Sequence, residues 1–226
     1  HRHGYKTYEI NNDMDAIIEA YTKEKVVCMI EAHDWTGGGI DFYSNSDYKK
    51  GGIPRSHNNV PETLEDPFDE FGGKSHYETQ YDIVMDFFGY FARKYRDNPY
   101  VWFNVFNEPG VALTNYYDKD GNKIKEIPDY WMHMHGIFVE RIRAMGNNNI
   151  VVFDGIASGQ DHGEWWSESG WGKFSPHSSA ILTYGEKVVG YNGANHHNVL
   201  FSFHVYDMWG NNAEVMDQYI TAVHEK

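Results

Sequence analysis

Glu108 stands at the end of an apolar stretch, VWFNVFNEPG, which covers residues 101–110. The first six residues of this stretch are mostly apolar and favour a β-strand, whereas Asn107, Pro109 and Gly110 are typical of a turn. A carboxyl group beside such a strand is partly removed from water, and desolvation disfavours the charged form of a carboxyl. A carboxylic acid that keeps its proton can protonate a leaving group, so Glu108 is the first candidate for a general acid/base.

Three further apolar runs end in polar residues in the same way. The four runs are KVVCMIEAH (25–33), YVWFNVFNE (100–108), NIVVFDGIAS (149–158) and VLFSFHVYD (199–207). Each has about the length of a strand and is rich in Val, Ile and Phe, a composition typical of strands buried on both faces of a parallel sheet. We therefore expect four strands whose carboxyl ends carry His33, Glu108, Asp154, and the pair His204 and Tyr206.

Helical patterns separate the four runs. The predicted helices cover 11–25, 77–99, 130–149 and 212–226, with a shorter one at 178–189. Asn or Asp would cap the first of them, and Gly146 would end the third. Helices that alternate with buried strands indicate an α/β protein built from βαβ units. Two architectures fit this order, a (β/α)8 barrel and an open doubly wound sheet. The Gly-rich stretch TGGGIDF (36–42) lacks the G-x-G-x-x-G spacing of a nucleotide site, so it favours a loop.

The polar strand ends are expected at one edge of the sheet. Long segments follow them, at 35–76, 109–129 and 159–180, whereas the opposite connections are short. In barrels of this class, active sites lie at the carboxyl ends of the strands. These segments and their surroundings are rich in tryptophan: Trp35, Trp165, Trp166, Trp171 and Trp209. The residue preferences of turns would explain polar residues at one strand end. Polar residues at all four strand ends favour a functional site.

Composition limits the partners of the chain. Its 226 residues are 41% hydrophobic, enough for a core, and carry a formal net charge of −14. An acidic surface repels nucleic-acid phosphate and anionic lipid, so we expect no nucleic-acid or membrane partner. No run is long enough to span a bilayer, and the single cysteine, Cys28, cannot form an intrachain disulfide. His133 and His135 lie two residues apart and cannot share a helix face, and no carboxylate has ligand spacing to either. We expect no metal and no cofactor.

The motifs NVFNEPG and FSFHVYDMWG, preceded by CMIEAHDWTG, together resemble glycoside hydrolase family 5, whose members are clan A retaining hydrolases. The elements EAHDWTG, GQD and FHVY are most similar to its bacterial β-mannanases and related endoglucanases. The resemblance covers roughly residues 25–225 and implies that the four strands are the third to sixth of a (β/α)8 TIM barrel. Residues 1–226 would then form a single, partial TIM-barrel catalytic domain.

The resemblance also implies a role for individual residues. Glu108 would be the general acid/base, and Asn107 would hold the 2-hydroxyl group of the sugar. His204 and Tyr206 would line the subsite beside the nucleophile, with His33 on its other wall. Sugars present flat C–H faces, so three tryptophans are the expected substrate platforms: Trp35, Trp166 and Trp209. The implied activity is retaining, endo-acting hydrolysis of a β-1,4-linked polysaccharide, β-mannan first and β-glucan second, by a secreted or extracellular protein.

A retaining glycosidase needs a second carboxylate about 5–5.5 Å from the first. In the family this nucleophile ends the seventh strand, which we expect beyond Lys226. Glu31 cannot replace it, because strand alternation would point Glu31 inward together with His33 but two residues deeper. A TIM barrel takes about 250 residues, so we expect segments beyond both ends of the chain, or a second copy, to complete the fold.

Two alternatives stay open at this point. One is a catalytically inactive, carbohydrate-binding relative that has the same fold and lacks the nucleophile. The other is an open-sheet α/β enzyme with an unrelated substrate.

Overall fold

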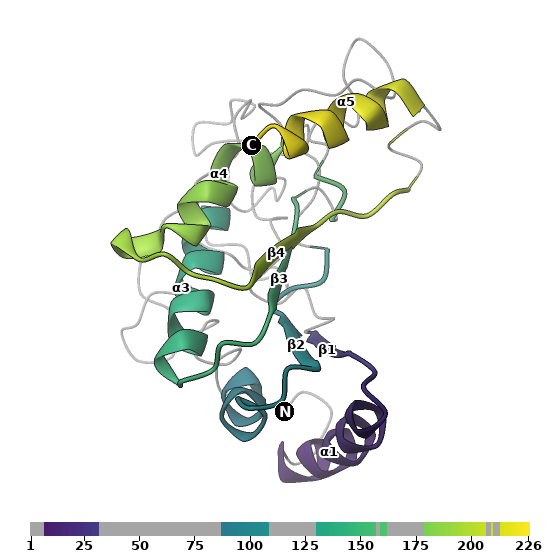
Figure 1. The fold of residues 1–226 in the computed structure, drawn as a ribbon, viewed down its shortest axis with the longest axis vertical. Coiled ribbons are helices and arrows are strands. Elements are labelled where there is room, and N and C mark those ends of the chain that lie inside the picture. The colour runs from purple at the N-terminus through teal and green to yellow at the C-terminus, as the bar shows by residue number, and fades with distance from the viewer. Residues whose placement is uncertain are drawn as a thin grey trace, which may run out of the picture.

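The computed structural model describes residues 7–31, 87–108, 130–156, 159–161, 179–206, 209 and 213–226. Four strands form one parallel sheet in the order β1-β2-β3-β4 (Figure 1). Their bounds are β1 Cys28–Glu31, β2 Val101–Asn104, β3 Val151–Asp154 and β4 Val199–Ser202. The order in the sheet repeats the order in the sequence, as successive β/α units of a barrel require. The four predicted parallel strands are therefore confirmed.

Helices alternate with these strands. They are α1 Thr7–Lys23, α3 Tyr130–Ala144, α4 Ala180–Val189, the 3-10 turn η5 Tyr191–Gly193 and α5 Ala213–His224, together with a helix described over 87–94. The short helix expected at 178–189 is α4, whose N-cap Ser179 accepts a hydrogen bond from the Leu182 backbone N–H. Gly146 follows α3 with φ 76°, which confirms its predicted place at the helix end.

Helix α1 begins earlier than the sequence predicts. We expected Asn or Asp at 11–13 to cap it, but the helix already starts at Thr7 and runs through these positions. Polar residues lower helix propensity by only a few tenths of a kcal/mol each, so tertiary packing overrides such a signal. Asp15, one turn further on, is buried and accepts hydrogen bonds from the Tyr95 hydroxyl at 2.6 Å and from Lys94 Nζ at 2.6 Å. These contacts fix α1 against the last residue of the 87–94 helix and the residue that follows it.

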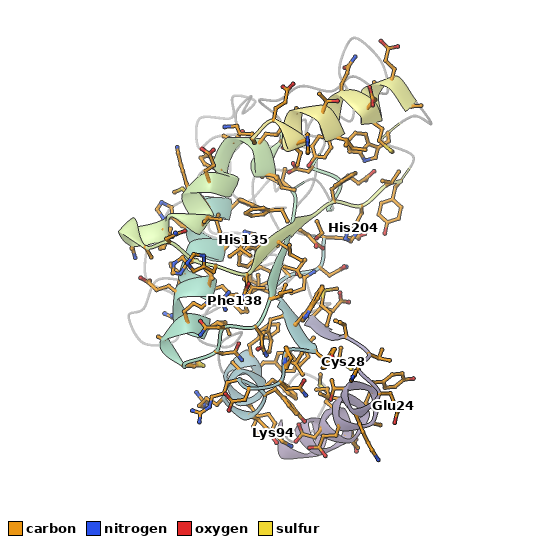
Figure 2. The ribbon with its side chains drawn as sticks, in the orientation of Figure 1. Glu24, Cys28, Lys94, His135, Phe138 and His204 are labelled. Carbon is orange, nitrogen blue, oxygen red and sulfur yellow. The ribbon has the colours of Figure 1, made fainter. Side chains whose placement is uncertain are left out.

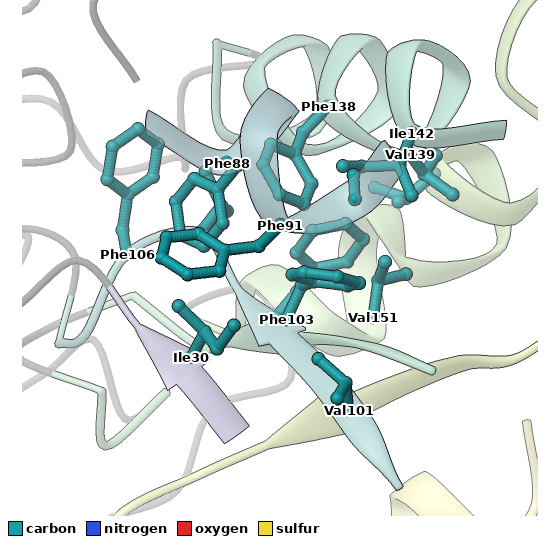
Figure 3. Close-up of a cluster of buried hydrophobic side chains, with 14 of the residues drawn as sticks. Ile30, Phe88, Phe91, Val101, Phe103, Phe106, Phe138, Val139, Ile142 and Val151 are labelled. Carbon is teal, nitrogen blue, oxygen red and sulfur yellow. The ribbon is translucent and has the colours of Figure 1, made fainter. Parts of the chain in front are cut away.

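The core lies between the sheet and the helices on one of its faces (Figure 3). Phe88, from the 87–94 helix, meets Phe138 of α3 edge-to-face at 5.2 Å between ring centroids, and Phe103 of β2 at 6.2 Å. All three rings are fully buried. Helices α3 and α4 pack against each other along this side of the sheet (Figure 1). Aromatic side chains of this size dominate the energetics of a core, so this layer holds the sheet in place.

The opposite face of the sheet is less covered. Ile30 and Phe201 pack into the helix-side core, so their neighbours Met29 and Leu200 point the other way. Met29 is 46% exposed and Leu200 is 44% exposed. These two residues belong to the outer strands β1 and β4, whereas the central strands β2 and β3 are largely buried. The sheet therefore presents apolar side chains on the face that is the interior in a closed barrel.

The amino-terminal edge of the sheet is closed by short connections. The Arg143 guanidinium donates hydrogen bonds to four backbone carbonyls, those of Asn147, Asn149, His197 and Asn198. Burial lowers the pKa of Arg143. Among the described helices, none combines the length and the apolar character that crossing a bilayer requires. At the carboxyl edge of the sheet, the register places Glu31 opposite Asn104 and Asp154 opposite Ser202.

Candidate active site

Glu108 lies four residues past the end of β2, on a turn with an unusual backbone conformation. Its φ is 52°, in the left-handed region that residues other than glycine rarely adopt. Such a conformation costs on the order of 1–3 kcal/mol and persists where surrounding contacts impose it. One of these contacts is the Glu108 backbone N–H, which donates to Asp154 Oδ2 at 3.1 Å. The end of β3 thus fixes the turn that carries the glutamate.

The Glu108 carboxyl group is held by two side chains that follow β4. Glu108 Oε1 lies 2.9 Å from His204 Nδ1 and accepts a hydrogen bond from the Tyr206 hydroxyl at 2.6 Å. The Glu108 side chain is 19% exposed, whereas Tyr206 is open to solvent. The hydrogen bond to Glu108, together with its charge, raises the pKa of Tyr206. The structure therefore brings together the three residues that the sequence predicts to be catalytic, with His204 just past the end of β4 (Figure 2).

His204 also contacts a second carboxylate. Its Nε2 lies 3.1 Å from Oδ2 of Asp154, the last residue of β3. Asp154 Oδ1 accepts hydrogen bonds from Asn104 Nδ2 at 3.0 Å and from the Ser202 hydroxyl. The Asp154 side chain is only 1% exposed, so its two oxygens are occupied by protein donors from β2, β4 and the turns that follow them. Asp154 joins three strand ends and places His204 between two carboxyl groups.

Two residues that follow β3 bind the backbone of the segment that carries His204 and Tyr206. Gly159 accepts a hydrogen bond from the His204 backbone N–H at 2.8 Å, and Gln160 Oε1 accepts one from the Tyr206 backbone N–H at 3.3 Å. Gly159 has φ 76°, and a Cβ atom there would lie 3.0 Å from the His204 ring and 3.2 Å from Glu108 Cγ. Only glycine satisfies both the backbone conformation and the close approach.

Asp161 anchors this segment to two helices. Its side chain is fully buried and accepts hydrogen bonds from the Ser179 hydroxyl, from the Ala180 backbone N–H at 2.8 Å and from the Tyr219 hydroxyl at 2.9 Å. Burial raises the pKa of Asp161 to about 6, although the hydrogen bonds from Ser179 and Tyr219 act in the opposite direction. The segment that carries Gly159 is thus tied to the start of α4 and to α5.

The structure describes two of the remaining predicted site residues and leaves three outside its described part. Asn107 is 8% exposed beside Glu108. Trp209 is 1% exposed, its ring packs against Phe203 and Tyr219, and its Nε1 donates to the His204 backbone carbonyl at 3.1 Å. The ring is thus packed against protein and its Nε1 supports His204, while its role as a sugar platform stays a prediction. Three predicted residues lie outside the described part of the chain: His33, Trp35 and Trp166.

Two residues of the site received no role from the sequence, Asp154 and Gly159. Asp154 follows the apolar residues IVVF of the third run, as Glu108 follows those of the second, so the strand-end pattern contained a signal for it. Its function as an acceptor from three strand ends depends on the register of β3 against β4, which a single sequence does not reveal. Gly159 is part of the GQD element, and its positive φ and its close approach to His204 and Glu108 explain its identity.

The arrangement fits proton transfer. A carboxyl group that is partly buried and bonded to an imidazole and a phenol is a suitable general acid/base. His135, by contrast, is fully buried among Trp131, Phe106 and Phe153, and burial lowers its pKa to about 3, so it stays neutral. Within the described ranges, no three His, Cys, Asp or Glu side chains gather in a way that could hold a metal ion.

Comparison with known proteins finds one matching family model and a set of similar solved structures. The family model described as cellulase, glycosyl hydrolase family 5, matches residues 2–226. A β-mannanase from Thermomonospora fusca in complex with mannohexaose is 17% identical, with a TM-score of 0.52, over 95% of this chain and 51% of that one. A Streptomyces thermolilacinus β-mannanase with mannohexaose is 21% identical (TM-score 0.50, 95% and 50% covered). A triple mutant of an endo-β-1,4-glucanase from Xanthomonas axonopodis pv. citri is 15% identical (TM-score 0.52, 97% and 55% covered).

At such low identities the solved structures show the fold alone, which is the TIM-barrel fold. The chain spans about half the length of these structures. No curated protein sequence matches it.

Proposed function

Since the chain belongs to the cellulase family, glycosyl hydrolase family 5, we propose that it is the central part of a retaining glycoside hydrolase that cleaves a β-1,4-linked polysaccharide. The observation that carries this proposal is the Glu108 carboxyl group, bonded to His204 and Tyr206 at the carboxyl edge of a parallel sheet. This is the edge at which barrel enzymes of all kinds assemble their active sites.

In the proposed reaction, Glu108 gives its proton to the glycosidic oxygen while a nucleophilic carboxylate attacks the anomeric carbon. The bond to the leaving sugar breaks, and a covalent glycosyl-enzyme forms. Glu108 then takes a proton from water, which attacks the anomeric carbon and releases the product with retained configuration. Tyr206 and His204 orient the Glu108 carboxyl group, and Asn107, directly before it, is proposed to hold the sugar 2-hydroxyl.

The nucleophile is proposed to come from outside this chain. Asp154 does not suit the role, because it is 1% exposed and both of its oxygens are bonded to protein donors. Glu31, at the end of β1, is level with Val152 in the sheet register and therefore lies two residues below Asp154. The uncovered Met29 and Leu200 support the proposal that further strands of the same polypeptide, or of a second copy, pack against this face.

Mannan is the first substrate to test and β-glucan the second. The related structures include β-mannanases and an endo-β-1,4-glucanase, and two of them contain mannohexaose. A net charge of −14 is compatible with a neutral polymer and unfavourable for an anionic one. Polymers of this kind do not enter cells, so we propose that the protein acts in the extracellular space.

The test compares Glu108→Gln with the wild type in the complete polypeptide that we propose contains this chain. Loss of a general acid typically lowers the rate by about 10²–10⁴. We expect this loss in kcat/KM on mannan or on an uncharged cellulose derivative, and a much smaller loss in kcat/KM on an aryl glycoside whose leaving group needs no proton. Glu186→Gln, at an exposed position of α4, is the matched control. Wild-type hydrolysis by Glu108→Gln on both substrates would refute the proposed role, and activity confined to an α-glucan would refute the proposed substrate class.

A further inference from the structure

We propose that Asp154 is a positioning residue that keeps His204 protonated at Nε2, so that the hydrogen bond between His204 Nδ1 and Glu108 Oε1 holds a proton that Glu108 can transfer. This inference rests on the proposed function of Glu108 as acid/base. It concerns a residue that does not touch the substrate and acts on Glu108 through His204.

The donors around Asp154 determine which imidazole nitrogen carries a proton. Oδ1 accepts from the Asn104 amide and the Ser202 hydroxyl, and Oδ2 accepts from the Glu108 backbone N–H. A carboxylate has about four acceptor positions, so the remaining one on Oδ2 faces His204 Nε2 at 3.1 Å. A lone pair on Nε2 would be repelled by this carboxylate oxygen at 3.1 Å, so we infer that Nε2 carries a hydrogen.

The tautomer of His204 then decides where the next proton lies. With Nε2 protonated, a neutral imidazole has only a lone pair at Nδ1, and Nδ1 lies 2.9 Å from Glu108 Oε1. A short contact between a lone pair and a carboxyl oxygen requires a proton between them. That proton belongs either to Glu108, which then is the acid, or to a cationic imidazole beside a Glu108 carboxylate. In both forms one transferable proton lies between His204 Nδ1 and Glu108 Oε1.

Without an acceptor at Asp154 the other tautomer becomes available. A neutral His204 with its hydrogen at Nδ1 would donate to an ionised Glu108, and Nε2 would be left with a lone pair. Glu108 would then accept from His204 as well as from Tyr206, and it would hold no proton for a leaving group. Asp154 excludes this arrangement because its Oδ2 has no hydrogen to offer to a bare Nε2.

Two substitutions separate the acceptor role of Asp154 from packing. Asp154→Ala removes the acceptor. Asp154→Asn can keep it, because its carbonyl oxygen can replace Oδ2 while its amide turns toward Ser202 and Asn104. In the described structure the Asn104 Oδ1 atom is buried without a hydrogen-bond partner. If the Asn104 amide group turns over, this oxygen can accept a hydrogen bond from the amide nitrogen introduced at position 154, and Oδ1 gives up no existing bond. Ser202→Ala is the matched control, since it removes an Oδ1 donor and leaves the contact with His204 intact.

Kinetics on a series of aryl glycosides, in the complete polypeptide, test the consequence for catalysis. For Asp154→Ala we expect kcat/KM to fall by about 10² or more with poor leaving groups and by less than about tenfold with dinitrophenolate, which needs no proton. Asp154→Asn and Ser202→Ala should keep the leaving-group dependence of the wild type. An equal loss on every leaving group in Asp154→Ala would mean a merely structural role and would overturn the proposal.

The tautomer itself is measured by NMR of protein labelled with ¹⁵N-histidine, with the His204 signals assigned through His204→Gln. We expect a protonated Nε2 in the wild type and in Asp154→Asn, and loss of that proton from the neutral ring in Asp154→Ala. A wild-type His204 with a bare Nε2 overturns the inference even if Asp154→Ala does not fold. The spectrum does not depend on hydrolysis, so a protein that is inactive on all β-glycans would refute the proposed function and still leave the tautomer to be decided.

Discussion

Replacing Asp161 by Asn should make the fold progressively more stable than the wild type as the pH rises. Burial raises the pKa of Asp161 to about 6 from an ordinary value of 3.8. The folded protein therefore holds this proton more tightly than the unfolded chain does. Stability from the protonated carboxyl is complete below about pH 3.8 and is lost as the pH rises through about 6. Asn does not ionise, so the variant escapes this loss.

The magnitude follows from the size of the pKa shift. A difference of one pKa unit corresponds to 1.36 kcal/mol, so the shift of Asp161 amounts to about 3 kcal/mol between acid and alkaline conditions. The local geometry can accept the change. Oδ1 keeps its bond from the Ala180 backbone N–H, and the Ser179 and Tyr219 hydroxyls at Oδ2 can rotate to accept from the new amide.

Urea unfolding at pH 4, 5, 6, 7 and 8 measures the free energy of unfolding of both proteins. The gap in favour of Asp161→Asn should widen by about 2.4 kcal/mol across this range, most of it between pH 4 and pH 6. Asp97→Asn is the control, because the Asp97 side chain is 90% exposed and should give a flat difference. A constant gap for Asp161→Asn, or one that widens toward acid, would refute the account of this buried carboxyl.

Three further perturbations follow from the same structure. Gly159→Ala should cost about 1–2 kcal/mol of stability and also lower the rate of hydrolysis at least tenfold. The control Gly146→Ala has the same φ of 76° and no atom within 4 Å of the new Cβ, so it should lower stability alone. Equal activities of the two variants would contradict the close approach of Gly159 to His204. His135→Leu should gain stability relative to the wild type as the pH falls below about 6.5, since burial lowers the pKa of His135 to about 3, and a urea series without this trend would argue against it. Met29→Lys should reduce self-association of the 226-residue chain in light scattering, and it should destabilise the complete polypeptide if further strands cover that face.

The order of the strands could be predicted from the sequence, but their ends could not. Four runs of Val, Ile and Phe predicted β1 to β4 in the right order, because burial on both faces leaves a continuous apolar signal. Each predicted run extended past the last paired residue. In the second run the chain leaves the sheet after Asn104 and reaches Glu108 with φ 52°, a change imposed by contacts with Asp154. No local pattern contains such a contact.

Part of the candidate site could be predicted because its residues follow neighbouring strands. Glu108, His204 and Tyr206 lie at strand ends, and parallel strands bring their carboxyl ends together whatever the details of packing. Trp209 was given a sugar-binding role because exposed tryptophans suit that purpose. Its burial depends on Tyr219, ten residues later on α5, and on Phe203, which are tertiary contacts.

The central claim, that Glu108 is the acid/base of a retaining hydrolase, is tested most directly by adding azide to Glu108→Ala in the complete polypeptide. A dinitrophenyl β-mannobioside needs no acid to form the glycosyl-enzyme, and this variant lacks the base that lets water release it. We predict that azide restores turnover and that the product is the β-glycosyl azide, with the configuration of the substrate. An α-glycosyl azide would make Glu108 the nucleophile, and turnover that azide does not change would mean that Glu108 is not the acid/base.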